Sequence, residues 1–489
     1  MNTIRHSVLI NILLFIISIF LCFWVRNEPF FWDTIQLGAM HGDWFYQQHF
    51  QYWLLPDSID SGHIPAFGWY LALIWIVFEQ NLIVSHFAMS LWIFLLLMQL
   101  YILINRYADS AAASIKSLFF STSILGLFLF LADPVLISQM TLVSPDVVLI
   151  GAFLLGINSI LDNKRLLLAL AIIILGLISM RGIMVAVGLF IWQLSNQFSS
   201  IKKKPFVTIK TILLPYLPAA ILVIVYLAYH FQVKGWIGIH ERSPWAASFA
   251  AVGLGGIVKQ FTVLIWRLLD FGRVFVWLAL SITVYLLYKR QTYSASNHFI
   301  KNLFSFIRLA IILLIILGTP AIFSAGLSQH RYFLPFFIII NLIFFQSILL
   351  IKSTAWRRGL WAIAFLGLIT GNRWVYPNKI AQGWDASLAH KPYFECKNQL
   401  KKFLSEENIL SSETGTVFPE IGIQHYRYLN DDETSFQPLD MNTQQYVFYS
   451  NIMNDFSDKQ LDELEKDWDI VFHCSNFGIH VYLYQSTGH

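Results

Sequence analysis

The sequence contains few charged residues. Asp, Glu, Lys and Arg make up 13% of its 489 residues, and hydrophobic residues make up 56%. A soluble protein carries about 25% charged residues, whereas the mean hydropathy of this chain is +0.59. This composition excludes an ordinary soluble protein and predicts an α-helical polytopic membrane protein whose surroundings are a lipid bilayer. The net charge of +4 forms no basic patch, so we expect no nucleic-acid partner.

Several sequence patterns are also missing. The chain has no P-loop, no dinucleotide-binding glycine pattern, no His-Glu-x-x-His motif, no internal repeat and no low-complexity tract. The glycines of residues 253–256 lack the strand–loop–helix context of a nucleotide loop. No Cys and His residues have the spacing of metal ligands, so the sequence indicates no cofactor and no metal site, and leaves a divalent metal open.

Cysteine is scarce. Cys22 lies in the first apolar segment, and Cys396 and Cys474 lie in the polar C-terminal part. The last two would be able to pair if that part faces an oxidising compartment, and two free buried thiols are the alternative.

Apolar segments of spanning length recur through residues 1–371. The first has a basic start and no cleavage site, which favours an uncleaved span. Together they predict about eleven transmembrane helices, near residues 7–25, 82–104, 117–132, 146–161, 166–180, 183–195, 211–230, 272–288, 303–319, 332–351 and 359–371. The apolar stretch 68–78 is shorter and predicts a juxtamembrane or re-entrant helix.

Lys and Arg residues fall in alternate loops. The first loop, residues 26–81, and the span after it contain none between Asn27 and Asn105. The positive-inside rule then places the N-terminus in the cytoplasm. An odd number of spans puts the first loop and the C-terminal part on the same extracytoplasmic face of a cell membrane, such as a bacterial inner membrane. The loops assigned to the cytoplasm hold Arg106, Lys116, Lys164, Arg165, Lys202, Lys203, Lys204, Lys210, Lys289, Arg290, Lys301, Lys352, Arg357 and Arg358.

The composition changes at residue 372. Residues 372–489 are rich in charge, Asn, Gln and aromatics and predict a small extracytoplasmic α/β or α+β domain, after a transmembrane domain of residues 1–371. Helices are predicted at 391–407 and 457–468, and strands at 416–418, 446–449, 469–473 and 479–484.

Residues 31–70 form the most unusual stretch. They contain many aromatics, no Lys or Arg, and the four aspartates Asp33, Asp43, Asp57 and Asp60. Aromatic rings with interspersed carboxylates are typical of a membrane–water interface. A carboxylate held there against apolar rings is a candidate general base.

Other loops assigned to the outer face add polar residues. Ser144 and Pro145 predict a helix start, so Asp146 is either a capping acid or a site acid. Arg181 is either a snorkelling arginine or a phosphate contact. Arg331 and Tyr332 are either a membrane anchor with an aromatic-belt residue or a phosphate-binding pair, because arginine offers bidentate donors to phosphate. An amphipathic stretch at residues 259–273 predicts an interfacial helix.

The run Trp32-Asp33, the aromatic-rich segment and the run Asp60-Ser61-Gly62-His63-Ile64-Pro65 resemble the first outer loop of the GT-C glycosyltransferases. More narrowly, they are similar to the protein O-mannosyltransferase and aminoarabinose-transferase group, which has an early acidic motif followed by a His-Pro-Pro motif. Two positions depart from the pattern. Thr34 stands where the mannosyltransferases have a second acid, and Ile64 replaces the first proline.

The resemblance implies roles for individual residues. Asp33 would be the catalytic base and Asp146 a second site acid, while His63 and Pro65 would shape the loop. Arg331 and Tyr332 would contact the phosphate of the lipid donor. We add Asp60 and Arg181 to the expected donor-binding residues, because they lie in the same set of loops.

The expected function is therefore that of an integral membrane glycosyltransferase. It would transfer a sugar, with inversion and without a required metal, from a polyprenyl-phosphate donor to a lipid, glycan or protein acceptor. The alternatives are an oligosaccharide ligase or polymerase that uses a diphosphate lipid donor, a lipid or polysaccharide transporter, and a non-catalytic scaffold. Charges inside the spans are nearly absent, which disfavours a transporter.

Overall fold

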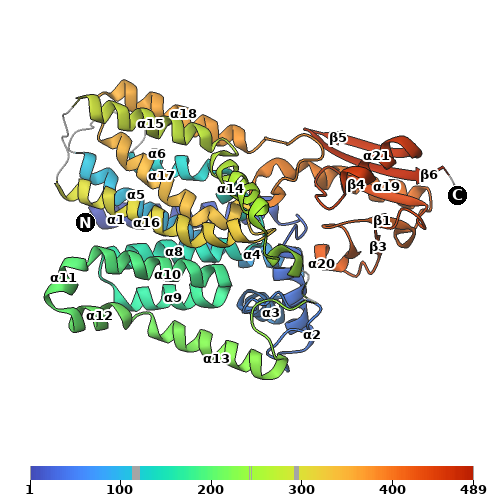
Figure 1. Ribbon diagram of the computed structural model, residues 1–489, viewed down its shortest axis with the longest axis horizontal. Helices are drawn as coiled ribbons and strands as arrows, with labels where there is room; N and C mark the ends of the chain where they lie inside the picture. The colour runs from blue at the N-terminus through green and yellow to red at the C-terminus, as the bar shows by residue number, and fades with distance from the viewer. Residues whose placement is uncertain (1, 113–121, 242, 244, 291–296, 488–489) are drawn as a thin grey trace.

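The structure is a computed structural model that describes residues 2–112, 122–241, 243, 245–290 and 297–487. The start of the span predicted at 117–132 and Lys116, which the sequence assigned to a cytoplasmic loop, lie outside these ranges. Figure 1 shows a helical bundle with a small sheet domain at one end. This arrangement confirms the fold class that the sequence predicts.

A helix lies at every apolar segment predicted to span the membrane. These helices are α1 (Asn2–Val25), α4 (Leu82–Ala88) with α5 (Ser90–Ala112), α6 (Thr122–Leu131), α8 (Pro145–Leu161), α9 (Arg165–Ile178), α10 (Met180–Asn196), α13 (Leu217–Lys234), α15 (Arg273–Arg290), α16 (Asn297–Phe323), α17 (Leu334–Leu349) and α18 (Thr354–Gly371). Shorter elements lie between them, namely η1 (Ile35–Met40), α2 (His41–Gln47), α3 (Ala66–Phe78), α7 (Pro134–Thr141), α11 (Phe198–Lys203), α12 (Pro205–Leu213), η2 (Ala246–Phe249), α14 (Leu254–Leu269) and η3 (His330–Phe333).

Not every helix is long enough to cross a bilayer alone. Among the described residues, five helices pass a test of length and composition, and up to seven do so if each bent pair forms one span. The pairs are α6 with α7, bent by 74°, and α14 with α15, bent by 76°. Three shorter apolar helices, α3, α8 and α9, add to these. The stretch predicted as juxtamembrane or re-entrant is α3, and the predicted interfacial helix is α14, which ends before Asp270.

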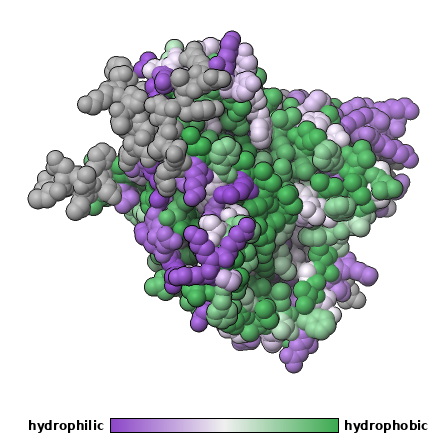
Figure 2. Space-filling view, turned by 60° about the vertical axis from the view of Figure 1, so that its left-hand side comes forward, coloured by the Kyte–Doolittle hydropathy of each residue, from purple (hydrophilic) through white to green (hydrophobic). Residues whose placement is uncertain are grey.

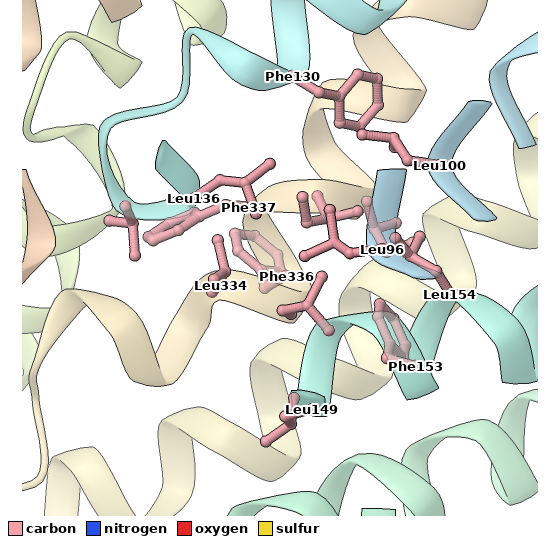
Figure 3. Packing of buried hydrophobic residues seen from close by; sticks show 14 of the residues in the cluster. Leu96, Leu100, Phe130, Leu136, Leu149, Phe153, Leu154, Leu334, Phe336 and Phe337 are labelled. Carbon is pink, nitrogen blue, oxygen red and sulfur yellow. The ribbon is translucent and has the colours of Figure 1, made fainter. Parts of the chain in front are cut away.

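The centre of the bundle is formed by helices that are apolar on all sides. In the span from His330 to Leu349, 89% of the window is buried, against 11% in α13. A helix that is hydrophobic all round belongs in a core or in lipid, so α17 is the central helix and α13 is a peripheral one. Figure 3 shows side chains of α5, α7, α8 and α17 packed against each other, among them Leu96, Leu100, Leu136, Leu149, Phe153, Leu154, Phe336 and Phe337.

The surface of the bundle is also apolar. Large side chains are exposed along α1 and α13, including Leu9, Phe20, Ile221 and Ile224. Figure 2 looks toward the end opposite the sheet domain and shows hydrophilic residues there beside a broad hydrophobic surface. The Lys-rich elements α11 and α12 lie at this same end in Figure 1.

The sheet domain follows α18. Its strands are β1 (Thr414–Thr416), β2 (Gly422–Ile423), β3 (Ser435–Pro438), β4 (Tyr446–Ser450), β5 (Trp468–Asn476) and β6 (Ile479–Ser486), in the order β2-β3-β1-β4-β6-β5. β1 pairs in parallel with β3 and β4, and the other pairs are antiparallel. The helical elements are η4 (Trp384–Ala386), η5 (Leu388–His390), α19 (Pro392–Glu406), η6 (Ser411–Glu413), α20 (His425–Tyr428) and α21 (Asp458–Asp467).

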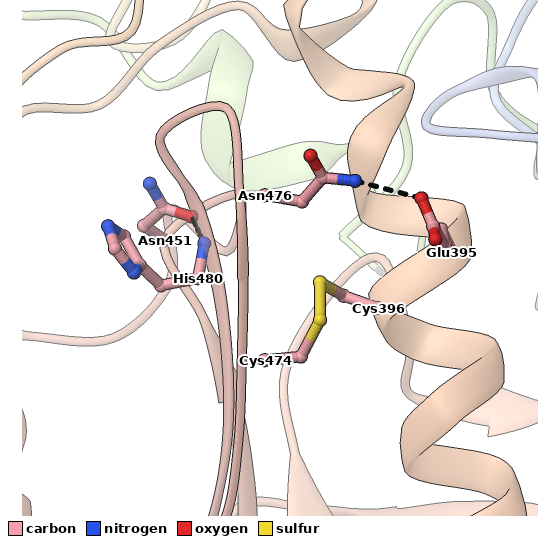
Figure 4. Close-up of a disulfide and its surroundings, with 6 residues drawn as sticks. All are labelled: Glu395, Cys396, Asn451, Cys474, Asn476 and His480. Carbon is pink, nitrogen blue, oxygen red and sulfur yellow. Dashed lines mark hydrogen bonds between the residues drawn. A yellow bond between two sulfur atoms is a disulfide. The ribbon is translucent and has the colours of Figure 1, made fainter.

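Both helices and all four strands predicted here are present within a few residues, and β2, β3 and α20 are additional. A capping box at Ser457 and Gln460 starts α21. Cys396 of α19 and Cys474 of β5 form a disulfide (Figure 4), which resolves the alternative that the sequence left open.

The sheet domain is docked firmly on the first loop. Lys391 Nζ lies 2.7 Å from Glu28 Oε2, and the His390 ring stacks on Phe31 at a centroid distance of 4.5 Å. Phe30 N donates to the carbonyl of Arg427 over 2.9 Å. The first loop and the C-terminal domain therefore meet at one end of the bundle, as expected from their assignment to the same face.

Candidate functional site

A cavity of about 160 Å³ lies at the end of the bundle that carries the sheet domain. Segments far apart in the sequence line it, from the first loop to the start of α17. Its lining consists of Asp33, Leu37, His41, His63, Ile64, Pro65, Phe67, Pro145, Ile178, Ser179, Met180, Arg181, Met184, Trp245, Ser248, Phe249, Leu317, Pro320, Leu327, Arg331 and Tyr332. Most of these side chains are apolar, so the few polar groups stand out as the chemically active ones.

Asp33 is held in a tight turn between α1 and η1. Thr34 Oγ1 donates to the carbonyl of Phe31 over 2.7 Å and accepts from Phe31 N over 3.0 Å. Trp32 adopts a positive φ of 56°, a conformation that side chains rarely take. The turn leaves the Asp33 carboxylate 6% exposed and in contact with Arg331. Thr34 therefore fixes the backbone of this turn.

Arg331 is the centre of a buried ion cluster. Its Nη2 contacts Asp33 Oδ2, its Nη1 lies 3.5 Å from Asp146 Oδ2, and its Nε lies 3.0 Å from Asp385 Oδ2. Arg331 is only 2% exposed. An unpaired charge at this depth would cost several kcal/mol, so the carboxylates are what allow the guanidinium to be there.

A second guanidinium joins the same cluster. Arg181 Nη2 lies 2.7 Å from Asp146 Oδ1, and its Nη1 donates to the carbonyl of Arg331 over 3.1 Å. Asp146 stands in the first turn of α8, which Ser144 caps by accepting from Asp146 N over 3.1 Å. The capping role predicted for this sequence is thus present, and the Asp146 side chain also binds both arginines. Three carboxyl groups thus face two guanidiniums.

Tyr332 completes the polar side of the cavity. The guanidinium carbons of Arg181 and Arg331 lie 4.6 and 5.0 Å from the centre of its ring. Arg331 Nη2 also donates to the Tyr332 hydroxyl over 3.4 Å. The ring thereby supports both cations by cation–π attraction and presents its hydroxyl beside them.

His63 lies across the cavity at the start of α3. Burial first, and then the nearby charge of Arg181, lower the pKa of His63 to about 4, so the imidazole is neutral at pH 7. A neutral ring nitrogen can accept a hydrogen bond, and His63 Nδ1 lies 3.4 Å from Met180 N. His63 and Pro65 therefore join the first loop to the start of α10.

Asp60 is placed differently from the other predicted residues, because it is not among those that line the cavity. Its Oδ2 lies 2.7 Å from Lys234 Nζ and 3.1 Å from His230 Nε2, and Gly62 N donates to its Oδ1 over 2.9 Å. Burial opposes ionisation of Asp60, but these hydrogen bonds outweigh it and hold its pKa below the usual range.

The Asp60 cluster fastens the first loop to the end of α13. Beyond α13, the chain approaches the loop so closely that a Cβ on Gly62 would lie 1.3 Å from the carbonyl oxygen of Gly238. Only glycine is tolerated at such a contact. The same connection continues to η2, where Ser248 and Phe249 line the cavity.

Sequence reasoning missed Asp385 of η4, which is 2% exposed and reaches the site from the sheet domain. Burial raises the pKa of Asp385, and the charges of Arg331 and Arg181 oppose this. It also missed Lys234 and His230. The sole signal for Asp385 is an acid within an aromatic stretch just after the last span, and nothing local distinguishes it from a surface residue.

No group of three or more His, Cys, Asp or Glu side chains in the described part of the chain is arranged to hold a metal ion.

Two solved structures are similar to this chain over nearly its whole length. They are ArnT from Cupriavidus metallidurans bound to undecaprenyl phosphate, with a TM-score of 0.48 and 12% identity, and the same protein in the apo state, with a TM-score of 0.46 and 11% identity. Each alignment covers 96% of this chain and 97% of ArnT. ArnT is an aminoarabinose transferase, from the group whose motifs the sequence resembles. No family model and no curated protein matches this chain. A likeness at this level leaves the reaction to be inferred from the residues of the site.

Proposed function

We propose that this protein is an integral membrane glycosyltransferase. It transfers a sugar from a polyprenyl-phosphate donor to an acceptor at the extracytoplasmic face, with inversion and with Asp33 as the general base. The observation that carries the proposal is a single, largely apolar cavity lined both by a carboxylate, Asp33, and by the phosphate-binding types Arg181, Arg331 and Tyr332.

The reaction needs a base and an anion site side by side. Asp33 takes the proton of the acceptor nucleophile while that atom forms a bond to the anomeric carbon. The bond from this carbon to the phosphate oxygen breaks, and the electron pair leaves with the polyprenyl phosphate. Arg181, Arg331 and the Tyr332 hydroxyl stabilise the charge that builds on the leaving oxygen. One displacement on one carbon inverts its configuration.

The apolar walls supply the surface for the lipid. Ligand pockets typically measure about 300–1,000 Å³, and this one is about 160 Å³ without ligand. A cavity of this volume accommodates part of the sugar phosphate. The isoprenoid chain continues between the apolar helices toward lipid, past side chains such as Met184 and Leu317.

We place the sheet domain and the cavity outside the cytoplasm. The Lys-rich elements α11 and α12 lie at the opposite end of the bundle, in agreement with the positive-inside rule. The Cys396–Cys474 disulfide in the sheet domain also suits an oxidising compartment. A donor for such a site must be presented by the outer leaflet, which is the reason for choosing a lipid-linked sugar.

The proposal is tested by incubating the purified protein in detergent with polyprenyl-phosphate sugars and a membrane extract that supplies acceptors. Release of polyprenyl phosphate that depends on the acceptor is the expected result, and the Asp33→Asn protein is the matched control. Undecaprenyl phosphate, the lipid bound in one of the ArnT structures, is the product standard. If the protein binds polyprenyl-phosphate sugars but releases no polyprenyl phosphate from them, it is not a transferase.

The same assay separates the alternatives. A ligase or polymerase would release polyprenyl diphosphate from diphosphate-linked sugars and leave the monophosphate donors intact. A transporter would move labelled lipid across vesicle membranes without cleaving it. Either result would replace the proposed reaction.

A further inference from the structure

The guanidinium of Arg331 is bound by carboxylates from three distant parts of the chain. Asp33 comes from the first loop, Asp146 from α8, and Asp385 from η4 in the sheet domain. Only Asp33 is among the residues that line the cavity. The other two, Asp146 and Asp385, contact the arginine without lining the cavity.

Asp385 is held in position independently of its side chain. Ser138 Oγ and Gln139 Nε2 donate to its backbone carbonyl over 2.8 and 2.7 Å. Gln139 Oε1 in turn accepts from Ser144 Oγ, the cap of α8. The carboxylate itself lies 3.0 Å from Arg331 Nε through Oδ2, an ion-pair contact without hydrogen-bond geometry. Neither Arg331 Nε nor Asp385 Oδ1 has a hydrogen-bond partner among the described residues.

We propose that Asp385 is a positioning residue for the reaction: it holds the Nε edge of Arg331 so that Nη2, the nitrogen in contact with Asp33, is shared between Asp33 and the donor phosphate. This inference rests on the proposed function, since it assigns Arg331 to the phosphate. A residue of the sheet domain thereby takes part in the site of the membrane domain.

The direction of the effect follows from the geometry. Without the Asp385 carboxylate, Arg331 keeps Asp33 and Asp146 as partners, so its charge stays compensated and the fold is retained. The guanidinium then turns toward Asp33, and the phosphate must compete with a stronger pair. Removal of the Asp385 carboxylate therefore weakens donor binding, although it takes an acidic group away from the site of an anionic ligand. If Asp385 acted only through its charge, its removal would strengthen the binding of an anion.

The experiment compares wild-type protein with Asp385→Asn, an isosteric change that leaves the backbone anchor intact. Binding of undecaprenyl phosphate and the kcat and KM of sugar transfer are measured for both. We expect about a tenfold higher Kd and KM for Asp385→Asn, with a kcat that falls less than threefold. Unchanged or tighter binding overturns the proposal.

Two further variants separate positioning from folding. Ser138→Ala weakens the backbone anchor and keeps the carboxylate, so we expect lower thermal stability with a nearly unchanged Kd. Asp469→Asn removes an exposed carboxylate of the same domain and is expected to behave as wild type. If Asp385→Asn does not fold, Asp385→Glu moves the carboxylate by one methylene and must still raise the Kd for the proposal to stand.

A double-mutant cycle shows whether Asp385 acts through Arg331. In an Arg331→Gln background, Asp385→Asn is expected to change the Kd less than twofold, and an undiminished effect there overturns the proposal. The binding measurements do not require turnover. A wild-type protein that binds undecaprenyl phosphate and transfers no sugar therefore refutes the proposed function while the effect on Kd still decides the role of Asp385. A wild-type protein that does not bind this lipid overturns both.

Discussion

Replacing Asp33 by Asn is expected to separate catalysis from donor binding. A general base contributes about 10²–10⁴-fold to the rate, so kcat should fall by about that factor. The same change removes the side chain that competes with the donor for Arg331. A hydrogen bond to a charged group contributes about 1.5–3 kcal/mol, and both partners are nearly buried, with Asp33 6% and Arg331 2% exposed.

The expected change in the free energy of lipid binding lies at the lower end of this range, because the amide oxygen that Asp33→Asn introduces still accepts a weaker hydrogen bond from Arg331. A gain of about 1.4 kcal/mol corresponds to a tenfold tighter Kd for undecaprenyl phosphate. The opposite signs for Asp33 and Asp385 arise because the Asp33 carboxylate lines the cavity and competes with the donor, whereas the Asp385 carboxylate contacts Arg331 Nε and does not line the cavity.

The assay measures single-turnover sugar transfer and, separately, the Kd for undecaprenyl phosphate in detergent. Asp57→Asn is the matched control, since Asp57 is an acid of the same loop with a side chain 42% exposed, and its kcat should stay within twofold of wild type. Transfer by Asp33→Asn at a near-wild-type rate would remove Asp33 from the mechanism. Weaker lipid binding by this variant would refute the competition for Arg331.

Three further outcomes are expected. Arg331→Ala should raise the donor concentration needed for half-maximal transfer at least tenfold, and an unchanged donor dependence would favour the membrane-anchor role. Asp60 has a lowered pKa, so it adds stability above the unfolded pKa of about 3.9 that is lost as the pH falls through its folded pKa. Asp60→Asn should melt earlier at pH 7, and the difference should shrink progressively in melting curves recorded as the pH falls below about 3.9. Replacing Cys396 and Cys474, which are 78 residues apart, with serine should destabilise the sheet domain by about 2–4 kcal/mol in denaturant titrations of purified protein, and no change would show that the bond does not stabilise it.

Local sequence patterns were sufficient to predict the structure wherever a segment determines its own conformation. Ser144 and Pro145 fix the start of α8 through a cap and a restricted φ, so this boundary was predictable. The apolar runs likewise predicted the helices, because a long apolar segment must bury its backbone polar groups in a helix. The bends between α6 and α7 and between α14 and α15 were not predicted, since two apolar helices joined by a short break look like a single run or an adjoining loop.

Contacts between distant segments were beyond sequence reasoning. Lys234 and Asp60 are 174 residues apart in the chain, and no sequence pattern around either residue indicates that they contact each other. Asp60 was expected beside the donor because it lies in the same acidic loop as Asp33. The structure places its carboxylate against α13 instead, since a buried acid is stabilised wherever cations approach it. Its role as a donor contact remains a proposal.

The site depends on the sheet domain as well as on the bundle. Asp385 binds Arg331 and also anchors to α7 through Ser138 and Gln139, while Lys391 holds Glu28 just before the Asp33 turn. These contacts fix the carboxylate and the guanidinium on rigid elements before a substrate arrives, which is the condition for electrostatic stabilisation of a leaving group without reorganisation. Because Asp33 and Asp385 belong to the first loop and to the sheet domain, the cluster around Arg331 is complete only when both are in place. Without the sheet domain, Arg331 would therefore lose one of its three carboxylate partners.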